Sequence, residues 1–249
     1  MDIGLQRASN VASAPDRAPL LRWLIFTGLI AFAAVLLWRY GLFRLMLAAD
    51  RTYISLVILG LYVLTSLHCL WRTATMAREG DTLRQNAALL TGPDAPGVLE
   101  DPRLLPEGAV SDHIRHLVTK AEQGGAGSID QTLLLRALAD RLRGSNGFGA
   151  FASDTLMKLG LLGTIIGFII MLAPIAELDA SDRSAMRASM GVMSDGMAVA
   201  MYTTLAGLVG SILIKVQYYL LDAATQRVFA AAVTLTETRV TPALERRHA

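Results

Sequence analysis

The chain has 249 residues, of which 53% are hydrophobic and 18% are charged, and its mean hydropathy is +0.44. Soluble globular domains contain about 45–50% apolar and about 25% charged residues, so this composition excludes a typical soluble enzyme and, for most of the chain, intrinsic disorder. The net charge of +2 gives no indication of nucleic-acid binding, and the single cysteine, Cys69, excludes an intrachain disulfide framework.

Four uncharged apolar stretches predict four transmembrane helices, at residues 23–38, 52–71, 159–176 and 196–214. A helix needs about 20 apolar residues to cross the hydrocarbon layer. The first stretch is short, but Arg22 and Arg39 can extend it by placing their charged ends in the interface. A cleaved signal peptide is the alternative for this stretch, yet the run ends in Trp-Arg-Tyr rather than in small residues. We therefore expect an all-α integral membrane protein with four transmembrane helices.

Lysine and arginine predict the orientation in the membrane. Basic residues are frequent in residues 72–158 and in the tail, whereas the loop between the third and fourth stretches is acidic on balance. Both termini and the middle segment are therefore expected in the cytoplasm, although Arg39, Arg44 and Arg51 of the first hairpin run against this orientation. The expected segments are a cytoplasmic N-terminal segment (1–22), an outer transmembrane hairpin (23–71), a cytoplasmic helical segment (72–158) with a Pro-rich linker (91–108), the third and fourth transmembrane helices (159–221) and a cytoplasmic tail (222–249).

The middle segment contains an amphipathic pattern. Leu134, Leu138 and Leu142 recur every four residues, with charged residues on the other faces, which predicts a helix whose leucines pack inward. His113 and His116 lie three residues apart, but no third ligand is nearby, so we expect no metal site. The chain also lacks a phosphate-binding loop ending in Lys-Ser/Thr and a His-Glu-x-x-His motif. We expect no catalytic residues, no enzymatic activity and no cofactor.

The third and fourth stretches differ from the first two because they are rich in small residues and hydroxyls. Small residues let helix backbones approach closely in a membrane, and tight packing alone is one interpretation. A narrow hydrated seam lined by threonines is the other. No charged residue lies inside any stretch, which disfavours a self-contained proton carrier. His68 is the one imidazole inside a stretch, and we expect it to be an interfacial hydrogen-bonded residue rather than a proton relay.

Two motifs resemble signatures of the MotA/TolQ/ExbB proton-channel family. Residues 159–167 resemble its third-helix signature, and residues 200–208 resemble its last-helix signature. The resemblance is close over residues 151–221, and the layout of four spans is more like MotA than the three-span TolQ and ExbB. One departure is Val199, which stands where TolQ and ExbB carry a glutamate, and the nearest acid is Asp195.

The resemblance implies a homopentamer in the bacterial inner membrane, in which the third and fourth helices line a central pore. It also implies a single-span partner of the MotB/TolR/ExbD type, whose intramembrane aspartate carries the proton. By position, Thr164 and Thr204 match the pore threonines of the family. The expected ion-pore lining comprises Thr164, Thr204, Thr203, Gly163, Gly167, Ala200 and Gly207.

The expected function is that of a pore-forming subunit of a stator or energy-transducing complex driven by the proton-motive force. It would conduct H⁺ together with its partner and convert the flow into mechanical work. A Na⁺-driven version of the same motor, a non-conducting membrane scaffold and, more weakly, a four-span permease stay open as alternatives. The process that is driven is also open, whether flagellar rotation, protein transport and outer-membrane energy transduction, envelope constriction, gliding or defence.

Overall fold

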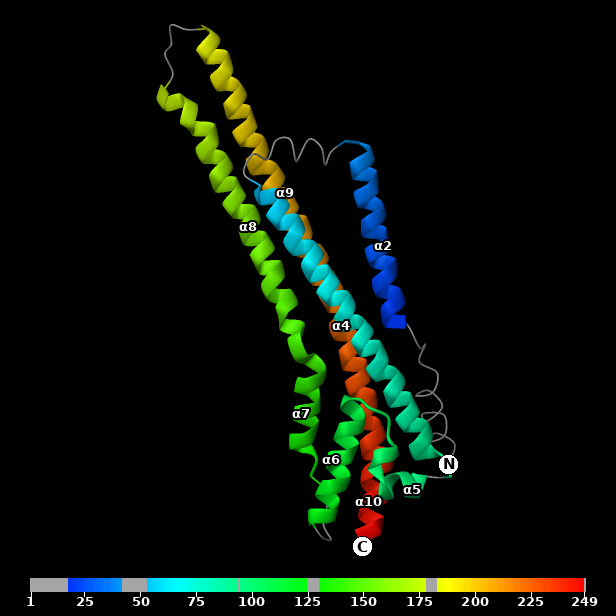
Figure 1. Ribbon diagram of the computed structural model, residues 1–249. Coiled ribbons are helices and arrows are strands. Elements are labelled where there is room, and N and C mark those ends of the chain that lie inside the picture. The colour runs from blue at the N-terminus through cyan, green and yellow to red at the C-terminus, as the bar shows by residue number, and fades with distance from the viewer. Residues whose placement is uncertain (1–17, 42–52, 94, 125–129, 178–182, 249) are drawn as a thin grey trace, which may run out of the picture. The chain divides into compact units, whose positions relative to one another are not determined.

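The structure is a computed structural model that describes residues 18–41, 53–93, 95–124, 130–177 and 183–248. These residues form helices joined by short connections, and no strand occurs among them (Figure 1). The chain divides into two compact units, which we name by composition. The apolar unit contains residues 23–70 and 146–219, and the polar unit contains the described residues of 1–22, 71–145 and 220–249.

Four helices in the described part of the chain are long and apolar enough to cross a membrane. They are α2 (Ala18–Arg39), α4 (Ile54–Thr91), α8 (Gly147–Leu172) and α9 (Arg183–Leu235). This confirms the all-α class and the number of membrane helices. Two of the helices extend far beyond the apolar stretches: α4 has 38 residues and α9 has 53. Residues 215–235 contain neither glycine nor proline, so nothing in the local sequence ends α9 where its apolar stretch ends.

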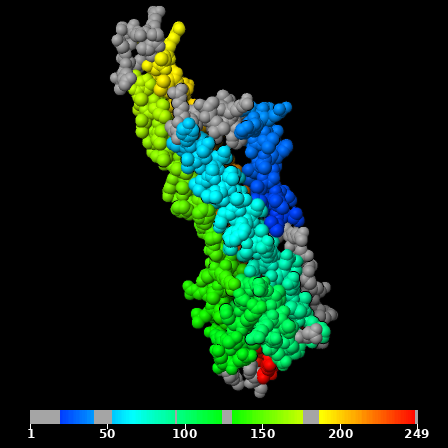
Figure 2. Space-filling view, in the orientation of Figure 1, coloured from blue at the N-terminus to red at the C-terminus, as the bar shows by residue number. Residues whose placement is uncertain are grey.

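In the apolar unit, α2 presents a face of large apolar side chains. Ile25, Leu29, Phe32 and Leu36 are exposed and recur at spacings of three and four residues, and the surface of this helix is blue in Figure 2. Apolar side chains on one helix face, with no protein covering them, suit contact with lipid acyl chains.

The polar unit is built around α6 (Ala109–Gly124), which contacts α7 (Thr132–Arg143) and α10 (Thr241–His248). The short helices α5 (Ala95–Glu100) and η1 (Pro102–Leu104) lie within the segment where the prolines predict a linker. The π-helical turn η4 (Thr236–Val240) joins α9 to α10. In α7, Leu138 and Leu142 are buried and Leu134 is half-buried, in line with the four-residue spacing.

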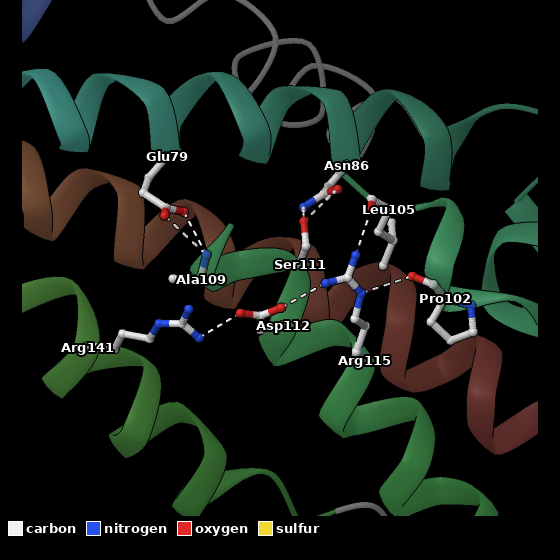
Figure 3. Close-up of polar contacts among 9 residues, drawn as sticks. All are labelled: Glu79, Asn86, Pro102, Leu105, Ala109, Ser111, Asp112, Arg115 and Arg141. Atoms are coloured by element: carbon white, nitrogen blue, oxygen red, sulfur yellow. Dashed lines mark hydrogen bonds and ion pairs between the residues drawn. The ribbon is translucent and has the colours of Figure 1, made fainter. Parts of the chain in front are cut away.

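Side chains of α4 hold the start of α6 (Figure 3). Both carboxylate oxygens of Glu79 accept the backbone N–H of Ala109, at 3.1 and 3.0 Å. The buried Asn86 amide donates to the Ser111 hydroxyl at 2.8 Å. A carboxylate at a helix N-terminus satisfies an otherwise unpaired N–H and interacts favourably with the helix dipole. These contacts therefore fix α6 against the part of α4 that continues beyond the apolar stretch.

Arg115 and Asp112 connect α6 to its surroundings (Figure 3). Arg115 donates through Nε to the Pro102 carbonyl at 3.1 Å and through Nη2 to the Leu105 carbonyl at 2.7 Å. Asp112 pairs with Arg115 at 2.8 Å and with Arg141 of α7 at 2.7 Å. A single guanidinium thus orders the backbone of η1 and of the residue that follows it, and a single carboxylate joins α6 to α7.

The end of α7 is held by Arg72 of α4. Its Nη2 donates to the carbonyls of Leu142 at 2.8 Å and Arg143 at 3.0 Å. Gly144 follows with φ of +45°, and a Cβ at this position would lie 2.8 Å from the same Nη2. Glycine is favoured here because it accepts a positive φ and leaves room for the guanidinium. A cation at these carbonyls also complements the negative end of the helix dipole.

Candidate functional site

The two helices with the small-residue motifs, α8 and α9, pack backbone against backbone in the apolar unit. A Cβ at Gly167 would lie 2.6 Å from the Ala200 nitrogen, and one at Gly207 would lie 2.7 Å from the Leu156 carbonyl oxygen. Neither position has room for a side chain. Such close contact is how helices associate where lipid removes the hydrophobic driving force. Gly167, Ala200 and Gly207 therefore lie at the contact between α8 and α9.

Thr203 belongs to the same contact. It is fully buried, and a Cβ at Gly163 would collide with its side chain. Its hydroxyl donates to the Val199 carbonyl at 2.8 Å, one turn earlier on α9. This back-bond satisfies the hydroxyl within its own helix. Gly163 and Thr203, both expected in the pore lining, thus lie inside the α8–α9 pair.

Thr164 and Thr204 lie at the outer edge of this contact. Thr204 is exposed and Thr164 is half-buried, and their hydroxyls are hydrogen-bonded to each other across the two helices. The Gly160 carbonyl oxygen lies 3.2 Å from the Thr164 hydroxyl, and the Ala200 carbonyl oxygen lies 2.9 Å from the Thr204 hydroxyl, so two O–H donors are shared among three contacts. Four oxygen atoms, two hydroxyl and two carbonyl, therefore gather at one point on the surface of the pair.

The chemistry of this oxygen cluster is adaptable. A hydroxyl carries one donor and two acceptor sites, and it chooses between them by rotation about its C–O bond. The Thr164–Thr204 pair can therefore donate to a carboxylate or accept the proton of a carboxylic acid. The neighbouring exposed side chains on α8 and α9, such as Leu161, Met201 and Leu205, are apolar. An ionised group facing them would have these hydroxyls as its hydrogen-bond donors.

Val199 occupies the position where the sequence departs from the TolQ and ExbB pattern. Its side chain is 2% exposed. An acid at this position would be buried, and a buried unpaired carboxylate is costly. Asp195, the nearest acid, is exposed one turn earlier on α9.

Further polar contacts lie along the helices of the apolar unit. The hydroxyls of Ser153 and Ser211 are buried and 2.9 Å apart. His68 Nδ1 lies 2.7 Å from the Tyr218 hydroxyl, so His68 is hydrogen-bonded, and its ring also packs edge-on against Phe148. These contacts join α4, α8 and α9.

Gln217 is a functional candidate that sequence reasoning missed. It is fully buried, and its amide donates to the hydroxyls of Ser66 at 3.0 Å and Thr27 at 3.4 Å. The sequence offered one indication of this role, since Gln217 is an uncharged polar residue just beyond the fourth apolar stretch. A buried amide held by two hydroxyls gives α9 a specific pairing with α2 and α4.

Within the described residues, no group of three His, Cys, Asp or Glu side chains is placed to hold a metal ion. The principal candidate site of the apolar unit is the oxygen cluster of Thr164 and Thr204, to which both α8 and α9 contribute.

Residues 114–232 match the family model described as the MotA/TolQ/ExbB proton channel family. No curated protein and no solved structure matches the chain. The matched segment includes α7, α8 and nearly all of α9, and so it contains both halves of the glycine contact and both threonines of the oxygen cluster. Over these residues, just under half of the chain, the sequence is similar to the MotA/TolQ/ExbB proton channel family.

Proposed function

We propose that the chain is the pore-forming subunit of an energy-transducing complex driven by the proton-motive force. The carrying observation is the Thr164–Thr204 hydroxyl pair, which lies at the outer edge of a glycine-packed helix pair whose apolar stretches contain no charged residue. The chain supplies hydroxyls but no intramembrane acid. A second chain must then supply the group that carries the proton. A single-span partner of the MotB/TolR/ExbD type, with one intramembrane aspartate, meets this need.

The assembly we propose is a ring of five copies in the bacterial inner membrane, with both termini and the polar unit on the cytoplasmic side. Each copy turns its Thr164–Thr204 edge toward the partner helices at the centre. The glycine contacts stay inside each copy and keep α8 and α9 rigid. In this arrangement Thr164 and Thr204 contact the partner. The second layer of the pore wall, behind these two threonines, consists of Thr203, Gly163, Gly167, Ala200 and Gly207.

The proposed mechanism uses the two roles of a hydroxyl. When the partner aspartate is ionised, the threonines donate to it; when it is protonated, one of them accepts its O–H. Each protonation change therefore alters which contacts are favourable, and the ring moves relative to the partner. Each proton that crosses supplies about 2.3 kcal/mol per 100 mV of membrane potential, which the complex converts into mechanical work.

A Na⁺-driven version of the same motor is the second candidate. The observation that favours it is the gathering of two hydroxyl and two carbonyl oxygens around Thr164 and Thr204. Hard cations prefer oxygen ligands of this kind.

Ion flux into vesicles tests the proposal. The chain is purified with its single-span partner and reconstituted into vesicles that contain a pH-sensitive dye. A potassium diffusion potential is then applied, with and without external Na⁺. We expect acidification that requires the partner and its aspartate but not Na⁺. Acidification that fails while Na⁺ enters would favour the second candidate. No flux of either ion from an intact complex would favour a non-conducting scaffold.

A further inference from the structure

The polar unit contains a buried histidine that the proposed function does not use. His113 of α6 is 4% exposed, and Nε2 of its ring has no hydrogen-bond partner among the described residues. Buried polar atoms in folded proteins are nearly always paired. Gln131, just before α7, is also 4% exposed, and its Oε1 is likewise without a partner. A donor-capable ring and an acceptor oxygen are thus both unsatisfied in the same core.

Gln131 connects His113 to the turn that follows α9. Its Nε2 donates to Oε1 of Glu237 in the π-helical turn η4, and its side chain also acts on the His113 ring. The three residues come from α6, the start of α7 and η4. The amide therefore stands between an imidazole and a carboxylate that are far apart in the sequence. π-Helical turns interrupt regular helices and are frequent at functional sites.

The surroundings of His113 disfavour a charge. Burial is the main cause that lowers the pKa of His113 from its ordinary value of 6.5, and it is partly offset by Gln131 and by the Leu134 backbone, which can accept hydrogen bonds from the imidazolium. Of the charged groups on α6, α7 and α10, only His116 on the same helix acts on the ring through its field, and it acts in the same direction as burial. The ring is therefore neutral at pH 7 in the packed unit.

We propose that His113 is a proton-binding site whose occupation loosens the packing of α6 against α7 and the contact of Gln131 with η4. A proton that binds Nε2 converts the imidazole to an imidazolium with two N–H donors. Burial disfavours this cation more than hydrogen bonds to Gln131 and the Leu134 backbone can offset, whereas water solvates it fully, so the protonated form favours a locally opened unit. For one linked proton, the opening equilibrium changes by up to about tenfold per pH unit.

This site gives the complex a response to acid on the side that holds the polar unit. That regulatory role rests on the proposed function, because it requires protons to be delivered there. The opening itself rests only on the burial of His113 and on its place between Gln131 and the core. The two parts are tested separately.

Hydrogen exchange tests the opening. The full chain in lipid nanodiscs is compared between pH 7.5 and 5.0, after correction for the intrinsic pH dependence of exchange, with peptides from α6, α7 and η4 as the readout. We expect exchange in the wild type to rise as the pH falls, by up to about tenfold per unit. The rise should be absent in His113→Gln and present in His116→Gln, the matched control on an exposed position of the same helix.

The proposal is overturned if wild-type exchange does not depend on pH, or if His113→Gln keeps the wild-type dependence. Imidazole NMR of the wild type covers the case in which His113→Gln does not fold. There we expect the His113 ring to titrate below pH 6.5 together with the rise in exchange. Titration above pH 6.5 overturns the proposal.

Proton flux tests the regulatory role. In vesicles, acid on the side of the polar unit should slow flux through the wild type and His116→Gln but not through His113→Gln. Equal inhibition in all three overturns the regulatory role. If no variant conducts, the proposed function fails, while the exchange result still decides whether His113 binds the proton.

Discussion

Thr204→Val separates a pore role from a packing role for the Thr164–Thr204 pair. Valine keeps the branched shape of threonine and removes only the hydroxyl. Thr204 Oγ bonds to Thr164 and donates to Ala200 at 2.9 Å. An uncharged hydrogen bond contributes about 0.5–1.5 kcal/mol net, and the Ala200 carbonyl lies in a continuous helix. We therefore expect the α8–α9 pair and the ring to survive the substitution.

The effect on transport should be larger. If Thr204 donates to the ionised partner aspartate, the contact is worth about 1.5–3 kcal/mol. Its loss at the rate-limiting step would slow flux by about ten- to a hundredfold, since about 1.4 kcal/mol corresponds to a factor of ten. The assay is proton uptake into vesicles containing the complex, with the oligomeric state measured in parallel by native mass spectrometry.

Thr203→Val is the matched control. It removes the same atoms from the adjacent residue, but Thr203 is fully buried and its hydroxyl bonds within its own helix. We expect near-normal transport from this variant. Full transport in Thr204→Val, or an equal loss in both variants with an intact ring, would refute the assignment of Thr204 to the pore.

Other variants test the packing of each unit and its response to pH. We expect native mass spectrometry to show a pentamer for the wild type. Gly207→Val should abolish this assembly, because a Cβ would lie 2.7 Å from a backbone oxygen. Gly191→Val should leave it intact, because nothing lies within 4 Å of a Cβ at that position. Leu138→Asp should lower the free energy of unfolding of the polar unit by about 2–7 kcal/mol, the cost of burying an unpaired polar group. Leu133→Asp, at a side chain that is 74% exposed, should change it little, and equal chemical-denaturation midpoints would contradict the α7 packing. Because the pKa of His113 is lowered in the folded unit, the free energy of unfolding should fall as the pH drops below about 6.5, by at most about 1.4 kcal/mol per unit; a denaturation midpoint that rises with acid would contradict this sign.

The sequence by itself determined the membrane helices and their class. A helix of about 20 apolar residues is more stable in the hydrocarbon layer than in water, and this preference depends on local composition alone. The small residues and the threonines of the third and fourth stretches were also visible locally, as was the four-residue spacing that buries Leu138 and Leu142. The family motifs lie in these same stretches, and the match over residues 114–232 agrees with them.

Only the tertiary structure decided which side of each helix faces a neighbour. Thr203 and Thr204 are adjacent in the sequence, but successive helical residues point about 100° apart. The position of α8 buries Thr203 against Gly163 and leaves Thr204 at the edge, bonded to Thr164. Composition cannot distinguish the two threonines, because the position of α8 is not encoded in the local sequence of α9.

In the polar unit, too, local sequence does not predict which histidine is buried, because the residues that pack together are far apart in the chain. His113 and His116 look equivalent in the sequence, yet one is buried and the other exposed. The buried ring interacts with Gln131, which in turn contacts Glu237 across 106 residues of chain. A pattern within one helix predicts that helix and its apolar face, whereas a buried proton-binding group is created by the elements that pack on it, because desolvation is a property of the whole surroundings.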